Sequence, residues 1–416
     1  MKRIVVYILS VLLLSPTLSA QLTIDDYRSS VEAYSLTLGR ADAAVEGADA
    51  QLRRQRKGRL PSVVMRSDID LVFRDKDNER QWSWNRRTEV NQTLYAGGGV
   101  RADIKRSELE YDIAEYSVEQ AQRDVVYEAE QAYWELSRAE VYHEAIADYI
   151  SIIRKLRDIV AHRFEEGYTS KNDLLQVESR MSDAEYQLSA AKQDYLLALH
   201  NFNVLRGVEP SHEVVLYNSI LDSMVMPVRR NIDYLLSSHP EYAISKAERE
   251  VARWGIRSAG AKYLPSMDLS LYGFLQPNAP HRAGGGMHLD GGVVLSMNTP
   301  IFHFRERREA VREAESNYRI SELNVESMVD KLSLMESNGW TNLQTIRSRI
   351  DASQRNLTLA EENLSISTYA YGEGSVTILD VLQAQISWLQ IYTNAIMARY
   401  DYALAVAAYR RITGDL

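Results

Sequence analysis

The sequence predicts a mainly α-helical protein of long antiparallel helical hairpins, coiled-coil-like in character, with four β-strands and an internal duplication. Residues 100–165 contain neither Pro nor Gly, and apolar residues recur there every three or four positions, as in coiled-coil helices. Residues 61–95 instead alternate polar and apolar side chains with the period of a strand. Both patterns return in the second half of the chain, which predicts two copies of one plan.

Residues 1–20 have the composition of a secretory signal peptide. Lys2 and Arg3 precede an apolar run at residues 4–14, and the small pair Ser19 and Ala20 follows it. This run is too short for a bilayer, which needs about 20 apolar residues. We therefore expect an exported chain.

Composition argues against several functions. The net charge of −9 lacks the basic footprint of a nucleic-acid-binding protein, and the absence of Cys excludes disulfides and thiolate metal sites. The eight histidines form no pair with helical spacing for zinc, and no nucleophile and base can be matched. We expect no enzyme activity, no cofactor, no metal and no nucleic-acid partner.

The first repeat is expected at residues 21–207 and the second at 240–414, joined by an irregular connector at 208–239. Thr23 is expected to cap a first helix that reaches about Arg56. The remaining elements of the first repeat are a hairpin at 61–95, a long helix at 100–165 and a return helix at 171–205. The second repeat has a helix, a hairpin at 265–299, a long helix at 306–371 interrupted only by Gly339, and a return helix at 376–412.

Short matching stretches support the duplication. Leu264-Pro265-Ser266 repeats Leu60-Pro61-Ser62, and the turn sequence that starts at Gly374 repeats the one that starts at Gly167. A helix of residues 100–165 would be about 100 Å long at 1.5 Å per residue, and the two shorter helices of a repeat would each cover about half of it. We expect the shorter helices to stack end to end beside the long one.

The hairpins allow two interpretations. One polar face fits a soluble sheet, whereas strands of about ten residues fit a transmembrane barrel. Phe73, Trp82 and Trp84 lie beside the turn of the first hairpin and are candidate membrane-interface aromatics. Because the smallest single-chain barrel has about eight strands, four strands would have to be pooled by two, three or four copies.

Several short segments stand out along the chain: Gln92-Thr93-Leu94-Tyr95 before Gly97-Gly98, Tyr133-Trp134-Glu135-Leu136 within the long helix, and the two Gly-x5-Asp turns. Together they resemble the TolC family of outer-membrane efflux proteins. The resemblance covers essentially the whole mature chain. It implies a homotrimer with a shared twelve-stranded barrel in outer membrane lipid and a helical tunnel in the periplasm. It also implies a periplasmic adaptor (membrane fusion) protein and an inner-membrane RND or ABC pump as partners, with the trimer as a passive exit duct for efflux or type I secretion.

The resemblance also implies site residues at the closing end of the tunnel. Asp173 and Asp380 match family positions where acidic residues face the narrowed lumen, although each could equally be a helix-capping aspartate. Val376 stands where the family can have an arginine tether, and Gln383 replaces a second acid. The implied gate residues are Asp173, Gln176, Tyr371, Asp380 and Gln383. The implied adaptor-docking turns are Glu166, Gly167 and Tyr168, and Glu373, Gly374 and Ser375.

A second function remains open from the residues alone. A soluble periplasmic coiled-coil adaptor or structural protein, with each hairpin in a small β-domain, would need no membrane.

Overall fold

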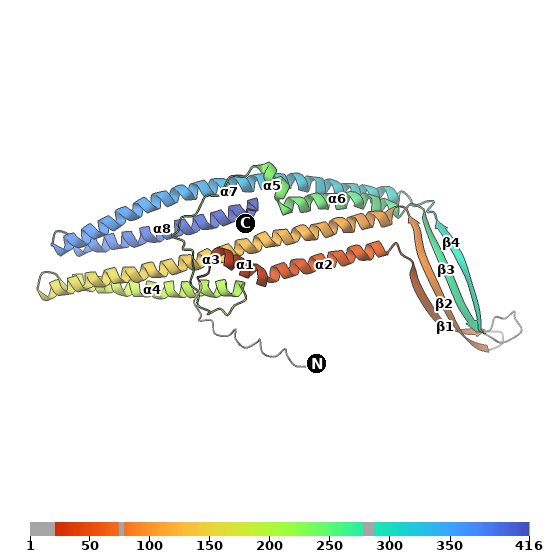
Figure 1. Cartoon of the computed structure of the whole chain (residues 1–416), viewed down its shortest axis with the longest axis horizontal. Helices are drawn as coiled ribbons and strands as arrows, with labels where there is room; N and C mark the ends of the chain where they lie inside the picture. Colours follow the sequence, from red (N-terminus) through yellow and green to blue (C-terminus); the bar gives the residue numbers. More distant parts are fainter. Residues whose placement is uncertain (1–20, 75–78, 278–286, 416) are drawn as a thin grey trace, which may run out of the picture. The chain divides into compact units, whose positions relative to one another are not determined.

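The computed structural model describes residues 21–74, 79–277 and 287–415. It consists of long helices and one antiparallel four-stranded sheet (Figure 1). The first repeat contains α1 (Ile24–Tyr34), α2 (Leu36–Lys57), β1 (Ser62–Arg74), β2 (Glu79–Ala96), α3 (Gly99–Glu165) and α4 (Lys171–Leu205). The second contains α6 (Pro240–Ala261), β3 (Ser266–Pro277), β4 (Met287–Asn298), α7 (Glu306–Gly372) and α8 (Ile378–Thr413). The predicted mainly α fold with four strands is confirmed.

Three local expectations were wrong. The first helix is two helices that meet at Ser35, whose hydroxyl accepts a hydrogen bond from the amide of Leu38. The connector contains a short helix, α5 (Ile232–Ser238), whose first turn is capped by Asn231. Helix α7 runs unbroken through Gly339, where a Cβ would lie 3.1 Å from the ring of Tyr409 on α8. This glycine allows a close approach and does not interrupt the helix.

The sheet has the order β1-β2-β3-β4, and all neighbours are antiparallel. Its register places Val63, Val90, Leu271 and Val293 side by side across the four strands. The next row, Val64, Glu89, Tyr272 and Gly292, lies on the other face. Polar contacts also join the strands, including Thr93 to Asp268 and Ser270 to Asn91, both at 2.7 Å.

Within the described residues, β1 and β4 each pair along one side only, so both outer edges of the sheet keep unpaired backbone groups. Val63, Met65, Val293 and Met297 on these edge strands are 65–70% exposed. No helix within the described ranges is both long and apolar enough to cross a membrane.

The chain forms two compact units, and each unit draws on both repeats. One unit contains residues up to Leu38 together with 121–238 and 332 onward, and the other contains 39–120 and 239–331. In the first unit, α3, α4, α7 and α8 share one apolar core that includes Val160, Val177, Leu364 and Val381. In the second unit, α2 contacts α3 through Gln51 to Glu110 and Arg56 to Glu108.

The connector holds several helices of the first unit together. The backbone amides of Asn218 and Ile220 donate to the hydroxyls of Tyr133 and Ser137 on α3. Arg229 forms an ion pair with the buried Glu336 on α7 at 2.9 Å. The connector therefore bridges both helical hairpins.

Candidate functional site: the two hairpin tips

The two tips, where α3 turns into α4 and α7 turns into α8, have the same backbone design. Gly167 and Gly374 have φ values of +80° and +77°, which favour glycine. At the first tip, the amides of Gly167 and Tyr168 donate to the carbonyls of Phe164 and Arg163. The second tip repeats both bonds, so each long helix ends in a Schellman motif.

Each return helix starts with a capping box that contains one of the two predicted gate aspartates. At α4, Ser170 accepts from the amide of Asp173, and the Asp173 carboxylate accepts from the amide of Ser170. At α8, Thr377 and Asp380 make the same reciprocal pair. Both aspartates therefore cap helices, and Asp380 is also exposed.

Hydroxyl groups stabilise the ionised form of both carboxyls. The hydroxyl of Thr169 donates to the Asp173 carboxylate and lowers the pKa of that group. The Thr377 hydroxyl donates to Asp380 at 2.6 Å and lowers its pKa in the same way. Asp173 and Asp380 therefore each hold a negative charge at neutral pH.

The other predicted gate residues lie in different surroundings. Tyr371 is only 5% exposed and belongs to the core shared by the two hairpins. Among the described residues, neither its hydroxyl nor the buried Oε1 of Gln176 has a hydrogen-bond partner. Gln383 is exposed and donates to Ser387 on the same helix.

Arg163 joins the two tips of one chain, a contact that the sequence did not reveal. Its Nη1 donates to the carbonyls of Tyr371 and Gly372 at 3.0 and 2.8 Å, and its guanidinium lies 5.2 Å from the centre of the Tyr371 ring. These carbonyls are at the C-terminus of α7, where the helix dipole favours a cation. The only sequence signal was a basic residue in the last turn of α3.

The predicted docking turns present accessible surface. Tyr168 is 72% exposed. Glu166, Gly167, Glu373, Gly374 and Ser375 are exposed as well. By contrast, the predicted interface aromatics Phe73, Trp82 and Trp84 have side chains that lie outside the described part of the structure, although their backbones belong to β1 and β2.

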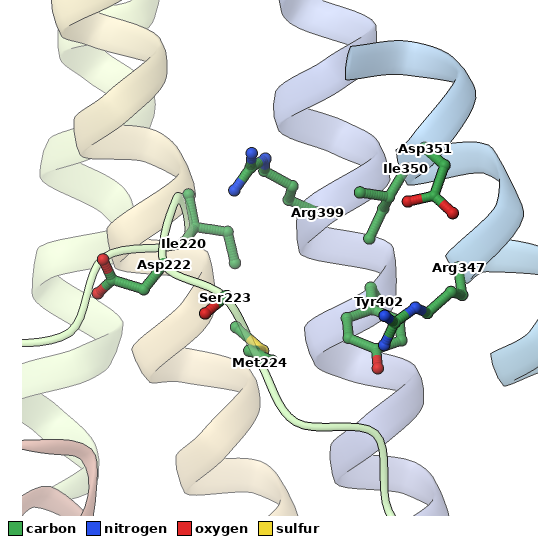
Figure 2. A pocket seen from close by; sticks show the side chains of 9 residues that line it. All are labelled: Ile220, Asp222, Ser223, Met224, Arg347, Ile350, Asp351, Arg399 and Tyr402. Atoms are coloured by element: carbon green, nitrogen blue, oxygen red, sulfur yellow. The ribbon is translucent and has the colours of Figure 1, made fainter. Parts of the chain in front are cut away.

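A separate pocket of about 180 Å³ lies beside the connector in the first unit (Figure 2). Ile220, Met224 and Ile350 supply its apolar lining, and Arg347 and Asp351 of α7 stand at its exposed side. Arg399 of α8 donates to the carbonyl of Leu221 and to Gln354, which attaches the connector to the helices. The charged residues that line the pocket, Asp222, Arg347, Asp351 and Arg399, do not form the arrangement of a catalytic site. Among the described residues, no group of three or more His, Asp or Glu side chains could hold a metal ion.

The structure thus combines an open four-stranded sheet, on which Val63, Val90, Leu271 and Val293 are aligned on one face, with two helices of 67 residues each. The chain belongs to the outer membrane efflux protein family, whose model matches residues 28–207 and 231–415. Membership confirms the resemblance to TolC-type proteins. It places the protein in the outer membrane, in a family of transport channels rather than enzymes.

Individual relatives are distant in sequence. The chain is 21% identical to the outer membrane efflux protein BepC of Brucella suis, covering 79% of this chain and 71% of that protein. It is 22% identical to the outer membrane protein TolC of Vibrio cholerae, covering 90% and 86%. The crystal structure of VceC from Vibrio cholerae superposes with a TM-score of 0.81 at 18% identity, covering 94% and 96%. These matches favour the channel interpretation over a soluble adaptor.

Proposed function

We propose that three copies of this protein form a passive exit duct of an export assembly that spans the cell envelope. Each copy would contribute four strands to a twelve-stranded barrel in the outer membrane and two helical hairpins to a tunnel in the periplasm. The observation that carries the proposal is the open sheet: an edge strand left unpaired in lipid costs several kcal/mol per backbone group, so copies must close it.

Exposed apolar side chains on the helices support assembly from several copies. Leu334, Leu359, Ile366 and Tyr369 of α7 are 60–72% exposed in the single chain. Burying such surface between copies is favourable by about 25 cal/mol per Å². Assembly into an oligomer would therefore explain why these apolar side chains are exposed in the single chain.

Within this duct, the tips would form the periplasmic gate. Asp173 and Asp380 would together place six carboxylates around the entrance, while Gln176, Tyr371 and Gln383 would line or support it. The exposed turns 166–168 and 373–375 would contact a periplasmic adaptor, and an RND or ABC pump would deliver cargo. Adaptor contact would open the gate without any chemical step in this protein.

Membrane fractionation and single-channel recording test the duct. We expect a heat-modifiable trimer in the outer membrane fraction that conducts ions in planar bilayers. Recovery of the native protein as a soluble periplasmic monomer would refute the proposal.

The carboxylate ring has its own test. Asp173→Asn with Asp380→Asn removes the charge but keeps an oxygen that can still accept the capping hydrogen bond. We expect weaker cation selectivity and weaker block by divalent cations. Asp148→Asn, at an exposed carboxylate on α3, is the control, and an equal loss of selectivity there would contradict the gate assignment.

A further inference from the structure

The two joints between strand and long helix use the same backbone turn with different residues. Gly97 and Gly98 precede α3 with φ values of +58° and +83°. Phe304 and Arg305 precede α7 at the matching positions with φ values of +41° and +68°. Within the described residues, these two are the non-glycine residues with positive φ. A side chain there is strained, so the second joint keeps a strain that the first joint avoids.

The first joint shows what lies beside such a turn. It seats against the joint between α6 and β3. A Cβ on Gly97 would lie 2.5 Å from the carbonyl oxygen of Ala261 and 2.7 Å from the Cβ of Leu264. Because β2 pairs with β3, these two joints are neighbours, and no side chain fits between them.

At the second joint, His303 meets the ring of Tyr263 from the α6–β3 joint, with centroids 5.5 Å apart, but the apolar residues of this joint stay open to solvent. Ile301, Phe302 and Phe304, which we call the seam patch, are 95%, 70% and 86% exposed. The rings of Phe302 and Phe304 meet edge to face with centroids 4.5 Å apart. A contiguous apolar surface of this kind marks an interaction site.

We propose that the seam patch packs against the joint between α2 and β1 of a neighbouring copy. This inference rests on the proposed function, which requires β4 of one copy to pair with β1 of the next. The neighbour's α2–β1 joint would then stand beside Phe304 as the α6–β3 joint stands beside Gly97. That joint repeats the sequence Leu-Pro-Ser, and its Leu60 is 63% exposed and available as an apolar partner.

The spacing between the two joints within one chain, at Gly97, cannot equal the spacing between copies at Phe304. A phenylalanine has no room at the distance that Gly97 keeps from Leu264, so the seam between copies is wider at this level than the joint within one chain. The aromatic rings fill that extra width. Contact with the neighbouring copy then explains why a strained Phe is kept where the first repeat has Gly.

Disulfide trapping tests the contact directly, because the chain contains no Cys. We expect Phe304→Cys combined with Leu60→Cys to give dimer and trimer bands on mild oxidation of outer membranes, and the bands to collapse on reduction. Phe304→Cys combined with Tyr116→Cys is the matched control. Tyr116 is exposed on α3 but about 25 Å along that helix from its start, so no bands are expected.

Relief of the backbone strain at Phe304 gives a second test, because it should affect the stability of the trimer and that of the single chain in opposite directions. Phe304→Gly should lower the temperature at which the trimer dissociates in detergent, while the dissociated chain should be at least as stable as wild type. Arg305→Gly is the control, because it relieves the same kind of strain and leaves the rings in place. Its trimer should keep the wild-type heat resistance.

Failure of the duct and failure of the seam contact give different results. Absence of wild-type trimers would refute the proposed duct. Intact trimers in which Phe304→Cys and Leu60→Cys give no cross-linked bands, or in which lipid-phase probes reach the thiol of Phe304→Cys, would refute the seam contact alone. Reaction with the lipid-phase probes would assign the patch to phospholipid, beside the exposed Arg305, Arg307 and Arg308. Equal heat resistance of Phe304→Gly and wild type would also refute the seam contact.

Discussion

The two hairpin tips have nearly the same backbone but different contacts. Both end a long helix with a left-handed glycine and start a return helix with a capping box. Yet Arg163, four residues before Gly167, caps the C-terminus of α7, whereas Ala370 holds the matching position before Gly374 and cannot donate. The two repeats therefore share the residues that form the turn, but only the first has an arginine that bonds the other tip. Arg163 of the first repeat thus fixes the end of α7 in the second repeat.

Arg163→Ala should have the largest effect at the tips. It removes two charge-assisted hydrogen bonds, each worth about 1.5–3 kcal/mol, and leaves two α7 carbonyls to water. We expect faster amide hydrogen exchange at residues 370–376 and a higher conductance of the duct without adaptor.

Two controls locate this effect. Arg157→Ala on the same helix removes a partly exposed arginine whose hydrogen bonds within the described residues go to its neighbour Asp158, so it should leave exchange at the tip unchanged. Tyr371→Phe should also be silent, since Arg163 uses the carbonyl and the ring and the hydroxyl has no partner in the described chain. If Arg163→Ala behaved like these controls, the tips would be equivalent.

Gly374→Ala and Gly167→Ala come next in size. Each places a side chain at a left-handed φ, at a cost of about 1–2 kcal/mol. A Cβ at Gly167 meets nothing within 4 Å, and one at Gly374 meets only Nη2 of Arg163, at 3.5 Å. We therefore expect equal losses in thermal stability. A clearly larger loss for Gly374→Ala would mean that the Arg163 contact cannot tolerate even a methyl group.

Substitution of the capping residues should lower the stability less, and by equal amounts at the two tips. Ser170→Ala and Thr377→Ala each remove one side of a capping box and should cost about 1 kcal/mol. Thr377→Ser keeps the hydroxyl and should cost much less. Thermal unfolding of the solubilised trimer measures all three, and a loss at only one tip would show that the two caps are unequal.

Acid should weaken both tips slightly. The folded pKa values of Asp173 and Asp380 are lowered, so their contribution is complete above the ordinary aspartate range and is lost as pH falls through the lowered values. The effect is small because the groups are accessible to solvent. Melting temperatures between neutral and acidic pH should fall more steeply for wild type than for Asp173→Asn. Parallel curves would count against this assignment.

Much of the fold followed from sequence periodicity and capping residues. Helices α3 and α4 begin and end within a residue of the expected positions, because Gly167, Ser170 and Gly207 act locally. The strands were recognisable from their alternation, and Asp173 and Asp380 were singled out by the resemblance to the TolC family.

The missed features depend on distant residues. Helices α1 and α2 separate where Tyr34 packs over Gly207, so closely that a Cβ on that glycine would touch the ring. Arg163 reaches carbonyls more than two hundred residues away, and no local pattern encodes such a pair. The left-handed φ at Phe304 was hidden because the usual sign of that conformation is glycine. The proposed roles of the gate and docking residues remain predictions.

The composition of the two compact units has a consequence for biogenesis. Glu130 in the middle of α3 forms ion pairs with Arg28 of α1 and Arg410 of α8. The first unit thus needs the earliest and the latest segments of the described chain together. During synthesis, the first unit cannot finish packing until α8 has emerged, whereas the second unit has all of its residues by position 331. Factors that bind the unpacked segments until then would protect them from aggregation.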